Sequence, residues 1–280
     1  MIGNMKRITK LNRRYYAGFS ILSRRSTGEK SIDSFSKNVF THGDISLTPK
    51  AICHICDIGC GNGIKSAIFF KNALKHFAGT IHLDIIEPNS DYLKEAIVNL
   101  TKIRSPRLKI KSYHCSAEKF LQKPTKKYDL ILASHVFYHL PLNLIFKFLE
   151  LLNSNGHLVI ITRSSKSSIA ILCNLFKPFT TSEKILEYIA QNAGKRSFAS
   201  IKYLSDIPAS LDLSGLTFTQ NKADLSEELK NLFGVLLAQD IDNLTNTQYK
   251  KIKNIIVRLK NKNILPINYS AIIMVSDPDS

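Results

Sequence analysis

The chain has 280 residues, a formal net charge of +17, and 44% hydrophobic and 22% charged residues, which suits one large α/β domain or a domain with an added cap. No apolar run approaches the ~20 residues that cross a bilayer, which excludes a transmembrane helix. The five cysteines are an odd number in a long chain, which excludes a disulfide scaffold and favours a reducing, cytoplasmic location.

Positive charge is concentrated in two segments. Residues 1–30 carry many basic side chains against the single acid Glu29, and residues 250–262 contain six basic residues and no acid. Such clusters attract phosphates, anionic surfaces or acidic partners, or they form a solvated, Lys-rich surface. The first 30 residues also have the composition of an organelle transit peptide, so import into an organelle, a basic N-terminal arm or cap over 1–45, and a lid all stay open.

From residue 51 onward the hydrophobic pattern alternates between strands and helices. It predicts strands over 51–57, 80–87, 108–114, 130–133 and 157–162, and helices over 63–77, 91–103, 117–121 and 142–152. Ser90 can cap the second helix. This order predicts an α/β fold with a doubly wound, mostly parallel seven-stranded sheet, whose core spans 46–165.

The rest of the chain is less regular. Residues 163–205 look helical and polar, and 166–214 form an expected helical connector. Residues 216–223 alternate like a strand, a helical insertion is expected over about 226–262, and residues 269–275 close the chain as a strand. The segment 215–280 would thus supply the last two strands, and we expect all four segments to form one compact domain.

A glycine turn follows the first strand, in the sequence Asp57-Ile-Gly59-Cys-Gly61-Asn-Gly63. Such a turn before a helix is a common cradle for nucleotide-like ligands. A P-loop needs a lysine directly after its last glycine, and Lys65 comes one position late. A dinucleotide site is also disfavoured, because its third glycine position falls on Ile64 and Asp57 would lie near the pyrophosphate.

The string DIGCGNG resembles instead the first motif of class I S-adenosylmethionine-dependent methyltransferases. The resemblance extends over about residues 50–162 and includes the acid Glu87 after the second strand, the segment HCSAEKF and the turn in LLNSNGHLVII. It implies S-adenosylmethionine as cofactor, with the glycines beside its methionine and ribose, Asp57 facing its cationic end and Glu87 accepting bonds from the ribose hydroxyls. The cofactor-binding residues implied in this way are Asp57, Gly59, Gly61, Gly63, Glu87, Ser116, Ala117, Glu118 and Ser134. For Ser116 and Glu118 a helix cap is an equal alternative.

The segment after the fourth strand, SHVFYHL, bears on the methyl acceptor. It lacks the Asn/Asp-Pro-Pro-aromatic motif of enzymes that methylate base amines, and no cysteine has the context of a cytosine methyltransferase nucleophile. The chain also bears a diffuse similarity to histamine N-methyltransferase-like proteins, in which a polar side chain at the place of His135 lies by the substrate amine. His135, Tyr138 and His139 are therefore the candidate catalytic residues.

Three functions are compatible with these patterns. The first is methyl transfer to a small-molecule acceptor, with amines among the candidates. The second is methylation of RNA or protein, with the basic clusters as the docking surface. The third is a methyltransferase-like binding module without catalysis. No metal is expected, because Cys53 and Cys56 lie in an apolar strand-like run and no second ligand pair follows. The oligomeric state is left open.

Overall fold

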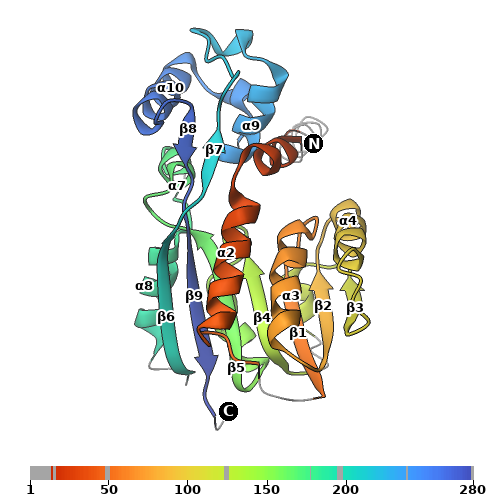
Figure 1. The fold of residues 1–280 in the computed structure, drawn as a ribbon. Coiled ribbons are helices and arrows are strands. Elements are labelled where there is room, and N and C mark those ends of the chain that lie inside the picture. The colour runs from red at the N-terminus through yellow and green to blue at the C-terminus, as the bar shows by residue number, and fades with distance from the viewer. Residues whose placement is uncertain are drawn as a thin grey trace. The chain divides into compact units, whose positions relative to one another are not determined.

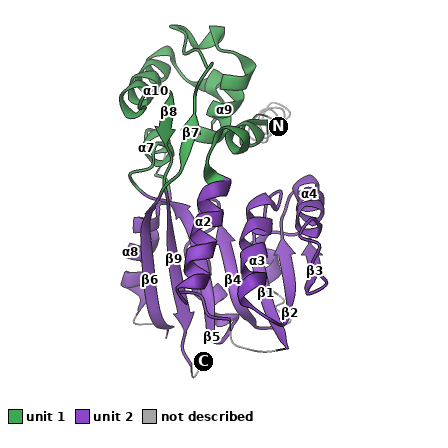
Figure 2. Cartoon of the chain, viewed as in Figure 1, with its two compact units in different colours: residues 1–28, 165–179, 208–268 green, residues 29–164, 180–207, 269–280 purple. Residues whose placement is uncertain are grey.

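The computed structural model describes residues 14, 17–47, 51–122, 126–176, 178–193, 198–237 and 239–278. The chain forms two compact units, shown in Figure 2. The sheet unit comprises 29–164, 180–207 and 269–280, and the helical unit comprises 1–28, 165–179 and 208–268. These units cut across the four consecutive segments expected from the sequence. Of the first basic cluster, Lys6, Arg7, Lys10 and Arg13 lie outside the described residues.

The sheet unit is built on seven strands in the order β3-β2-β1-β4-β5-β9-β6 (Figure 1). Strand β9 runs antiparallel to both β5 and β6, whereas the other neighbours are parallel. This order confirms the expected doubly wound, mostly parallel seven-stranded fold. The strands are β1 (Ile52–Ile58), β2 (Thr80–Ile86), β3 (Leu108–Tyr113), β4 (Tyr128–Ser134), β5 (Leu152–Arg163), β6 (Phe198–Ile207) and β9 (Tyr269–Ser276).

Helices cover both faces of this sheet. On one face, α2 (Gly28–Thr41) lies beside α3 (Ile64–His76), which in turn contacts α4 (Ser90–Thr101) (Figure 1). The ring of Phe69 on α3 lies 6.5 Å from Phe35 and 5.4 Å from Phe40 on α2. The other face packs α5 (Ala117–Leu121), α6 (Leu144–Glu150) and α8 (Ser182–Asn192) into one apolar cluster with β4 and β5. The sheet core is therefore closed on both sides.

Local sequence explains where most of these elements begin and end. The helix α4 starts with Asn89, whose side chain accepts hydrogen bonds from the Asp91 and Tyr92 backbone N–H groups, so the cap expected at Ser90 lies one residue earlier. Cys53 and Cys56 are buried within β1. The strand β4 is buried along nearly its whole length, as its apolar sequence predicts for a central parallel strand.

One expected strand is wrong, and one strand of the seven-stranded sheet was missed. Residues 216–223 form no strand. The Asn221 side chain caps a short 3-10 turn, and the Thr219 carbonyl accepts bonds from Tyr249 and Lys253 instead of a neighbouring strand. The seventh strand is β6, within the stretch expected to be helical. Its side chains are mostly exposed, and its extended form comes from pairing with the buried strand β9.

The helical unit brings together three separate stretches of the chain. A helix over residues 17–25 and α7 (Ser168–Cys173) accompany α9 (Glu227–Leu237) and α10 (Asn246–Leu259), which lie in the expected helical insertion. The antiparallel strands β7 (Ser210–Asp212) and β8 (Ile264–Pro266) complete it. Phe233 on α9 and Tyr249 on α10 are fully buried, so the insertion has an apolar core of its own.

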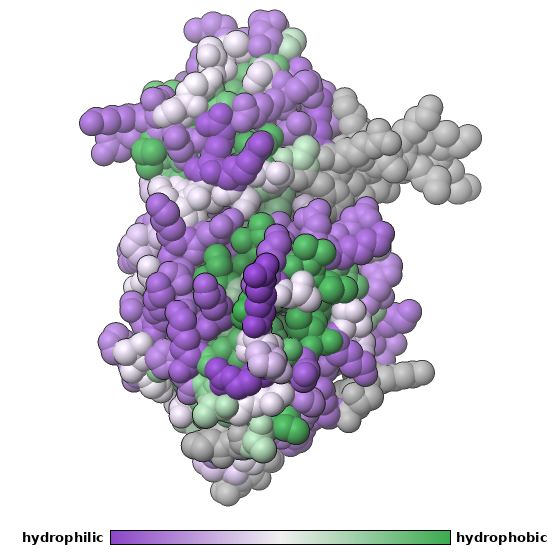
Figure 3. All heavy atoms as spheres, turned by 45° about the vertical axis from the view of Figure 1, so that its right-hand side comes forward, coloured by the Kyte–Doolittle hydropathy of each residue, from purple (hydrophilic) through white to green (hydrophobic). Residues whose placement is uncertain are grey.

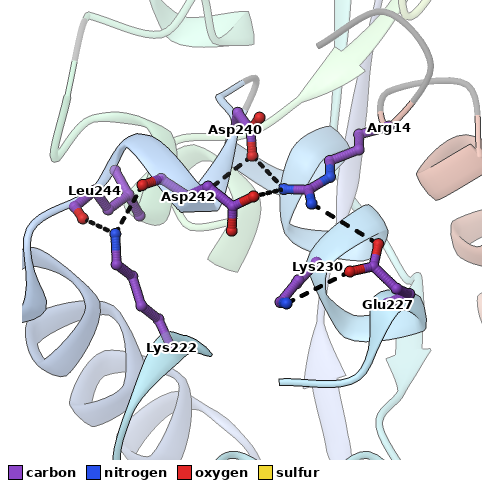
Figure 4. Close-up of polar contacts among 7 residues, drawn as sticks. All are labelled: Arg14, Lys222, Glu227, Lys230, Asp240, Asp242 and Leu244. Atoms are coloured by element: carbon purple, nitrogen blue, oxygen red, sulfur yellow. Dashed lines mark hydrogen bonds and ion pairs between the residues drawn. The ribbon is translucent and has the colours of Figure 1, made fainter. Parts of the chain in front are cut away.

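Ion pairs tie the described N-terminal residue to the rest of the helical unit. The Arg14 guanidinium binds Asp240, reaches Asp242 at 2.9 Å and Glu227 at 3.8 Å (Figure 4). Both Arg14 and Asp240 are buried. Lys222 donates to the carbonyl oxygens of Asp242, at 2.8 Å, and of Leu244. The same acidic turn thus connects the start of the chain with the insertion.

The surface of the sheet unit is not uniformly hydrophilic. Figure 3 shows apolar side chains gathered on one face of it, with hydrophilic ones around them. Val98 on α4 is one of its exposed large apolar residues, with 56% of its surface accessible. Within the part of the chain that the structure describes, no helix is both long and apolar enough to cross a bilayer.

Candidate active site

The glycine turn joins β1 to α3 at the carboxyl edge of the sheet. Gly59, Gly61 and Gly63 all have left-handed backbone conformations, with φ of 66°, 56° and 74°. A Cβ atom on Gly63 would lie 2.6 Å from the Ala96 Cα of α4, so this glycine lets two helices meet. A Cβ on Gly61 would meet nothing within 4 Å. The turn therefore leaves bare, accessible backbone at Gly61.

Glu87 follows β2 and reaches the same turn. Its Oε2 accepts a hydrogen bond from the Gly61 N–H at 2.9 Å, and its Oε1 accepts one from the Asn89 N–H at 2.9 Å. Burial raises the pKa of Glu87, and these two backbone bonds act against that rise. Each carboxylate oxygen can accept a further hydrogen bond, so Glu87 keeps capacity for a hydroxyl-bearing ligand.

Asp57 lies near the end of β1 and is 1% exposed. Burial raises its pKa to about 7, although a hydrogen bond from Ser66 lowers it, and the nearby charge of Glu87 adds to the rise. Its Oδ2 is buried and has no hydrogen-bond partner among the described residues. A buried carboxylate oxygen without a partner is costly, which suits a site that a cationic ligand completes.

The three residues expected beside an adenine lie after β3. The Ser116 side chain accepts from the Lys119 N–H at 3.3 Å and so caps α5, which is the alternative that the sequence left open. Ala117 is buried and Glu118 is exposed in the first turn of the same helix. The structure thus gives Ser116 a local capping contact and places all three residues one strand beyond Glu87.

The candidate catalytic residues follow β4. His135 has a left-handed φ of 57°, and its backbone N–H donates to the Ile161 carbonyl at 2.7 Å. Its Nδ1 is hydrogen-bonded to the Tyr138 hydroxyl, whereas its Nε2 is buried with no partner among the described residues. The Ser134 Oγ has no such partner either. His139 is exposed, with its ring 5.8 Å from Tyr138.

Three further residues surround His135 and were missed by the sequence analysis. The ring of Tyr269, at the start of β9, lies 4.4 Å from the His135 ring. Lys65 on α3 places its Nζ 5.0 Å from the centre of the Tyr269 ring, and the Arg163 guanidinium carbon lies 5.1 Å from it. We call Lys65, His135, Arg163 and Tyr269 the Tyr269 cluster.

The charges of this cluster act on its uncharged members. Burial lowers the pKa of His135 well below its usual value, and the positive charges of Lys65 and Arg163 lower it further. Burial alone would raise the pKa of Tyr269, but charge and hydrogen bonds from Lys65 and Arg163 outweigh burial and lower it. His135 is therefore a neutral imidazole near neutral pH, and the two cations favour negative charge on the tyrosine oxygen.

Only strand order could have identified this cluster from the sequence. Arg163 directly follows the apolar run of the fifth strand, and Tyr269 opens the last strand. They face each other because β9 runs antiparallel beside β5, where Arg163 and Tyr269 are register partners. The available signal was a basic residue at the end of the fifth strand, beside the fourth, together with an aromatic residue at the start of the last strand.

Comparisons with known proteins agree with this geometry. A family model described as "Methyltransferase domain" matches residues 22–214. Among curated proteins, none matches the chain by sequence.

Among solved structures, the chain is similar to the plantazolicin methyltransferase BamL, crystallised with a triazolic desmethyl analogue and SAH. The identity is 15%, covering 99% of this chain and 100% of that chain, with a TM-score of 0.51. The plantazolicin methyltransferase BpumL is 16% identical over 97% of this chain and 99% of its own, with a TM-score of 0.51. The YcgJ protein from Bacillus subtilis is 10% identical over 87% of this chain and 99% of its own, with a TM-score of 0.53. At these identities the likeness is one of fold.

Proposed function

Since the chain belongs to the methyltransferase domain family and S-adenosylmethionine is its methyl donor, we propose that it methylates a small-molecule acceptor at the carboxyl edge of its sheet. Three observations together carry this proposal: the open space beside the Gly61 backbone, the Glu87 carboxylate bound to the Gly61 N–H, and the unpartnered Oδ2 of Asp57 near the end of β1. A ligand with a sugar diol and a cationic end satisfies both acids. A non-catalytic module would have no need of the neutral imidazole that follows β4.

The cofactor supplies an electrophilic methyl group on a sulfonium. On the protein side, Glu87 holds the ribose hydroxyls, and Asp57 stabilises the positive charge of the methionine end. Gly59, Gly61 and Gly63 let the backbone approach the cofactor. Ser134 offers its free hydroxyl from β4, and Ser116, Ala117 and Glu118 flank the adenine.

The acceptor is held on the side of His135. In the tautomer whose Nδ1–H donates to the Tyr138 oxygen, Nε2 presents a lone pair to an N–H or O–H of the acceptor. Nε2 orients that N–H or O–H by accepting its hydrogen bond. As the acceptor atom gains the methyl group it loses this proton to solvent, because burial and the charges of Lys65 and Arg163 oppose protonation of His135. Tyr138 orients the imidazole, and His139 lies at the outer edge of this site.

Methylation of RNA or protein is the second candidate. The basic cluster at 250–262 lies largely on α10, whose buried face carries Tyr249, Ile252 and Ile256 and whose basic residues are mostly exposed. An exposed charged face is expected of any solvated amphipathic helix, so this basic face is not by itself a sign that the protein binds RNA or an acidic protein.

Removing the Glu87 carboxylate tests the cofactor site. We expect Glu87→Ala to weaken binding of the demethylated cofactor product, SAH, by roughly 1–3 kcal/mol, because charge-assisted hydrogen bonds are lost. Calorimetry with SAH measures this, Glu87→Gln separates charge from shape, and Glu95→Ala, an exposed acid on α4, is the matched control. An unchanged dissociation constant in Glu87→Ala would remove the ribose assignment.

Labelled S-adenosylmethionine identifies the class of acceptor. We expect label to enter the small-molecule fraction of a cell extract and not its RNA or protein fractions. Raising salt from about 50 to 200 mM should leave transfer to a small molecule unchanged. Transfer to RNA should fall, because binding that contacts several phosphates weakens sharply over this range. Salt-sensitive labelling of RNA, or labelling of protein, would replace the small-molecule assignment with the second candidate.

A further inference from the structure

The Tyr269 cluster concentrates positive charge around one buried ring. Tyr269 is 1% exposed and Arg163 is 6% exposed, whereas Lys65 is half-buried. The centre of the Tyr269 ring lies 5.0 Å from the Lys65 Nζ, 5.1 Å from the Arg163 guanidinium carbon and 4.4 Å from the centre of the His135 ring. Two cationic groups therefore lie close to His135, the side chain that we propose contacts the acceptor.

The charge of Lys65 is not neutralised by a neighbouring acid. Its Nζ forms no ion pair with any carboxylate of the described residues, and the charge of Glu29 is the smallest of the influences on the Lys65 pKa, which it raises. Burial lowers the pKa of Lys65, which means that the charged form loses hydration without a matching anion. Tyr269 offers Lys65 a neutral hydroxyl and a ring face, and neither balances a full charge. The cluster therefore favours an incoming negative charge and disfavours a cation.

Strand order separates this charge from the cofactor-binding acids. Asp57 lies in β1 and Glu87 directly follows β2, whereas Arg163 and Tyr269 belong to β5 and β9. Strands are spaced about 4.8 Å apart, so β9 lies roughly 14 Å from β1, three positions along the sheet. His135 on β4 stands between the two groups. Arg163 and Tyr269 thus lie on the acceptor side of His135, and Lys65, on the helix α3 that follows the glycine turn, reaches the Tyr269 ring at 5.0 Å.

We propose that Lys65 and Arg163, held in place by Tyr269, form a carboxylate-binding subsite, so that the acceptor is an acid-bearing small molecule. This inference rests on the proposed function, because it assigns the acceptor of that same site. It is compatible with an amine acceptor only if that amine also carries an acid, as an amino acid does. A simple cationic amine would be repelled by Lys65 and Arg163, whose charges add to burial in keeping His135 neutral.

Matched acids and amides test the subsite in the full-length chain saturated with SAH. The probes are acetate, benzoate and 3-phenylpropionate, each against its primary amide, titrated by calorimetry or ligand-observed NMR. We expect at least one acid to bind tenfold or more tightly than its amide. Lys65→Gln should remove that preference, and Lys71→Gln, which removes an exposed charge from the same helix, should retain it.

The outcomes separate the two proposals. No preference for any acid, or an equal preference in wild type and Lys65→Gln, overturns the subsite. If Lys65→Gln weakens SAH but not its amino-acid-free analogue methylthioadenosine, the cations bind the cofactor's carboxylate and the acceptor assignment is overturned. If SAH itself fails to bind the wild type, the proposed function fails first, independently of Lys65.

Discussion

At the scale of single residues, Asp57 shows how a site can be costly until its ligand binds. The folded chain holds this carboxyl in a buried position where its Oδ2 lacks a partner among the described residues. Its pKa of about 7, against an ordinary 3.8, means that folding favours the protonated acid. A cationic ligand end would reverse this preference by pairing with the carboxylate.

This shift predicts how stability depends on pH. Below pH 3.8 the carboxyl is protonated in both the folded and unfolded chain, so its burial carries no charge penalty. Between 3.8 and about 7 only the folded chain keeps the proton, so the free energy of unfolding falls as pH rises. A pKa shift of this size corresponds to ~4 kcal/mol. The free energy of unfolding loses this amount progressively up to pH 7 and does not fall further for this reason above pH 7.

The variant Asp57→Asn isolates that contribution. We expect its free energy of unfolding, relative to wild type, to increase by up to ~4 kcal/mol between pH 4 and pH 8, because the amide does not ionise. Urea unfolding at both pH values measures the difference, and other titrating groups cancel because both proteins share them. Parallel pH profiles for the two proteins would show that Asp57 does not carry a raised pKa.

At the scale of elements, the contact between α3 and α4 depends on one missing side chain. Gly63 begins α3 in a left-handed conformation and touches the backbone of Ala96 on α4. The glycine turn keeps its shape only if residue 63 can adopt the left-handed conformation and also has no side chain that would collide with α4. The shape of the cofactor cradle is thus set partly by a helix that is not in the motif.

We predict that Gly63→Ala destabilises the fold by several kcal/mol, since its Cβ would be 2.6 Å from another backbone atom and the neighbouring helix must shift. Gly43→Ala is the control. Gly43 has the same φ of 74° but nothing within 4 Å of its Cβ, so it bears only the backbone strain of ~1–2 kcal/mol. Chemical denaturation compares the two, and equal losses would mean that the helix contact is unimportant.

Sequence periodicity predicted the central parallel strands because each is buried by its own apolar run. It failed at β6, whose exposed side chains carry little hydrophobic signal and whose conformation is imposed by β9. The family resemblance, by contrast, predicted roles for Asp57 and Glu87 because a motif places them at fixed spacing. Both missed Lys65, Arg163 and Tyr269 because they converge only through the order of β4, β5 and β9, which no local pattern contains.

At the scale of the whole molecule, the helical unit is assembled from distant parts of the chain. Arg14 joins residues near the N-terminus to α9 and to the turn at Asp240. Because Asp240 is 6% exposed, its charge is stable in this position only with a cation beside it. Local packing within the insertion is therefore coupled to a residue more than two hundred positions away in sequence.

We predict that Arg14→Met destabilises the helical unit by about 3–5 kcal/mol, because it removes the guanidinium that pairs with the buried Asp240 carboxylate. Adding Asp240→Asn should restore most of that loss. Hydrogen exchange of α9 in the full chain measures it, and Lys37→Met, which breaks an exposed pair on α2, should cost under ~1 kcal/mol. A double variant no more stable than Arg14→Met would mean that packing, not charge, explains the loss.

The position of β9 has a consequence for how the protein is made. This strand lies between β5 and β6, and it is the last of the seven to leave the ribosome. The nascent sheet consequently carries an open edge at β5 while residues 164–268 are synthesised, and β6 is made before the neighbour that shapes it. Tyr269, which opens β9, is made with that strand, so the Tyr269 cluster can assemble only long after the glycine turn and Glu87 have been synthesised.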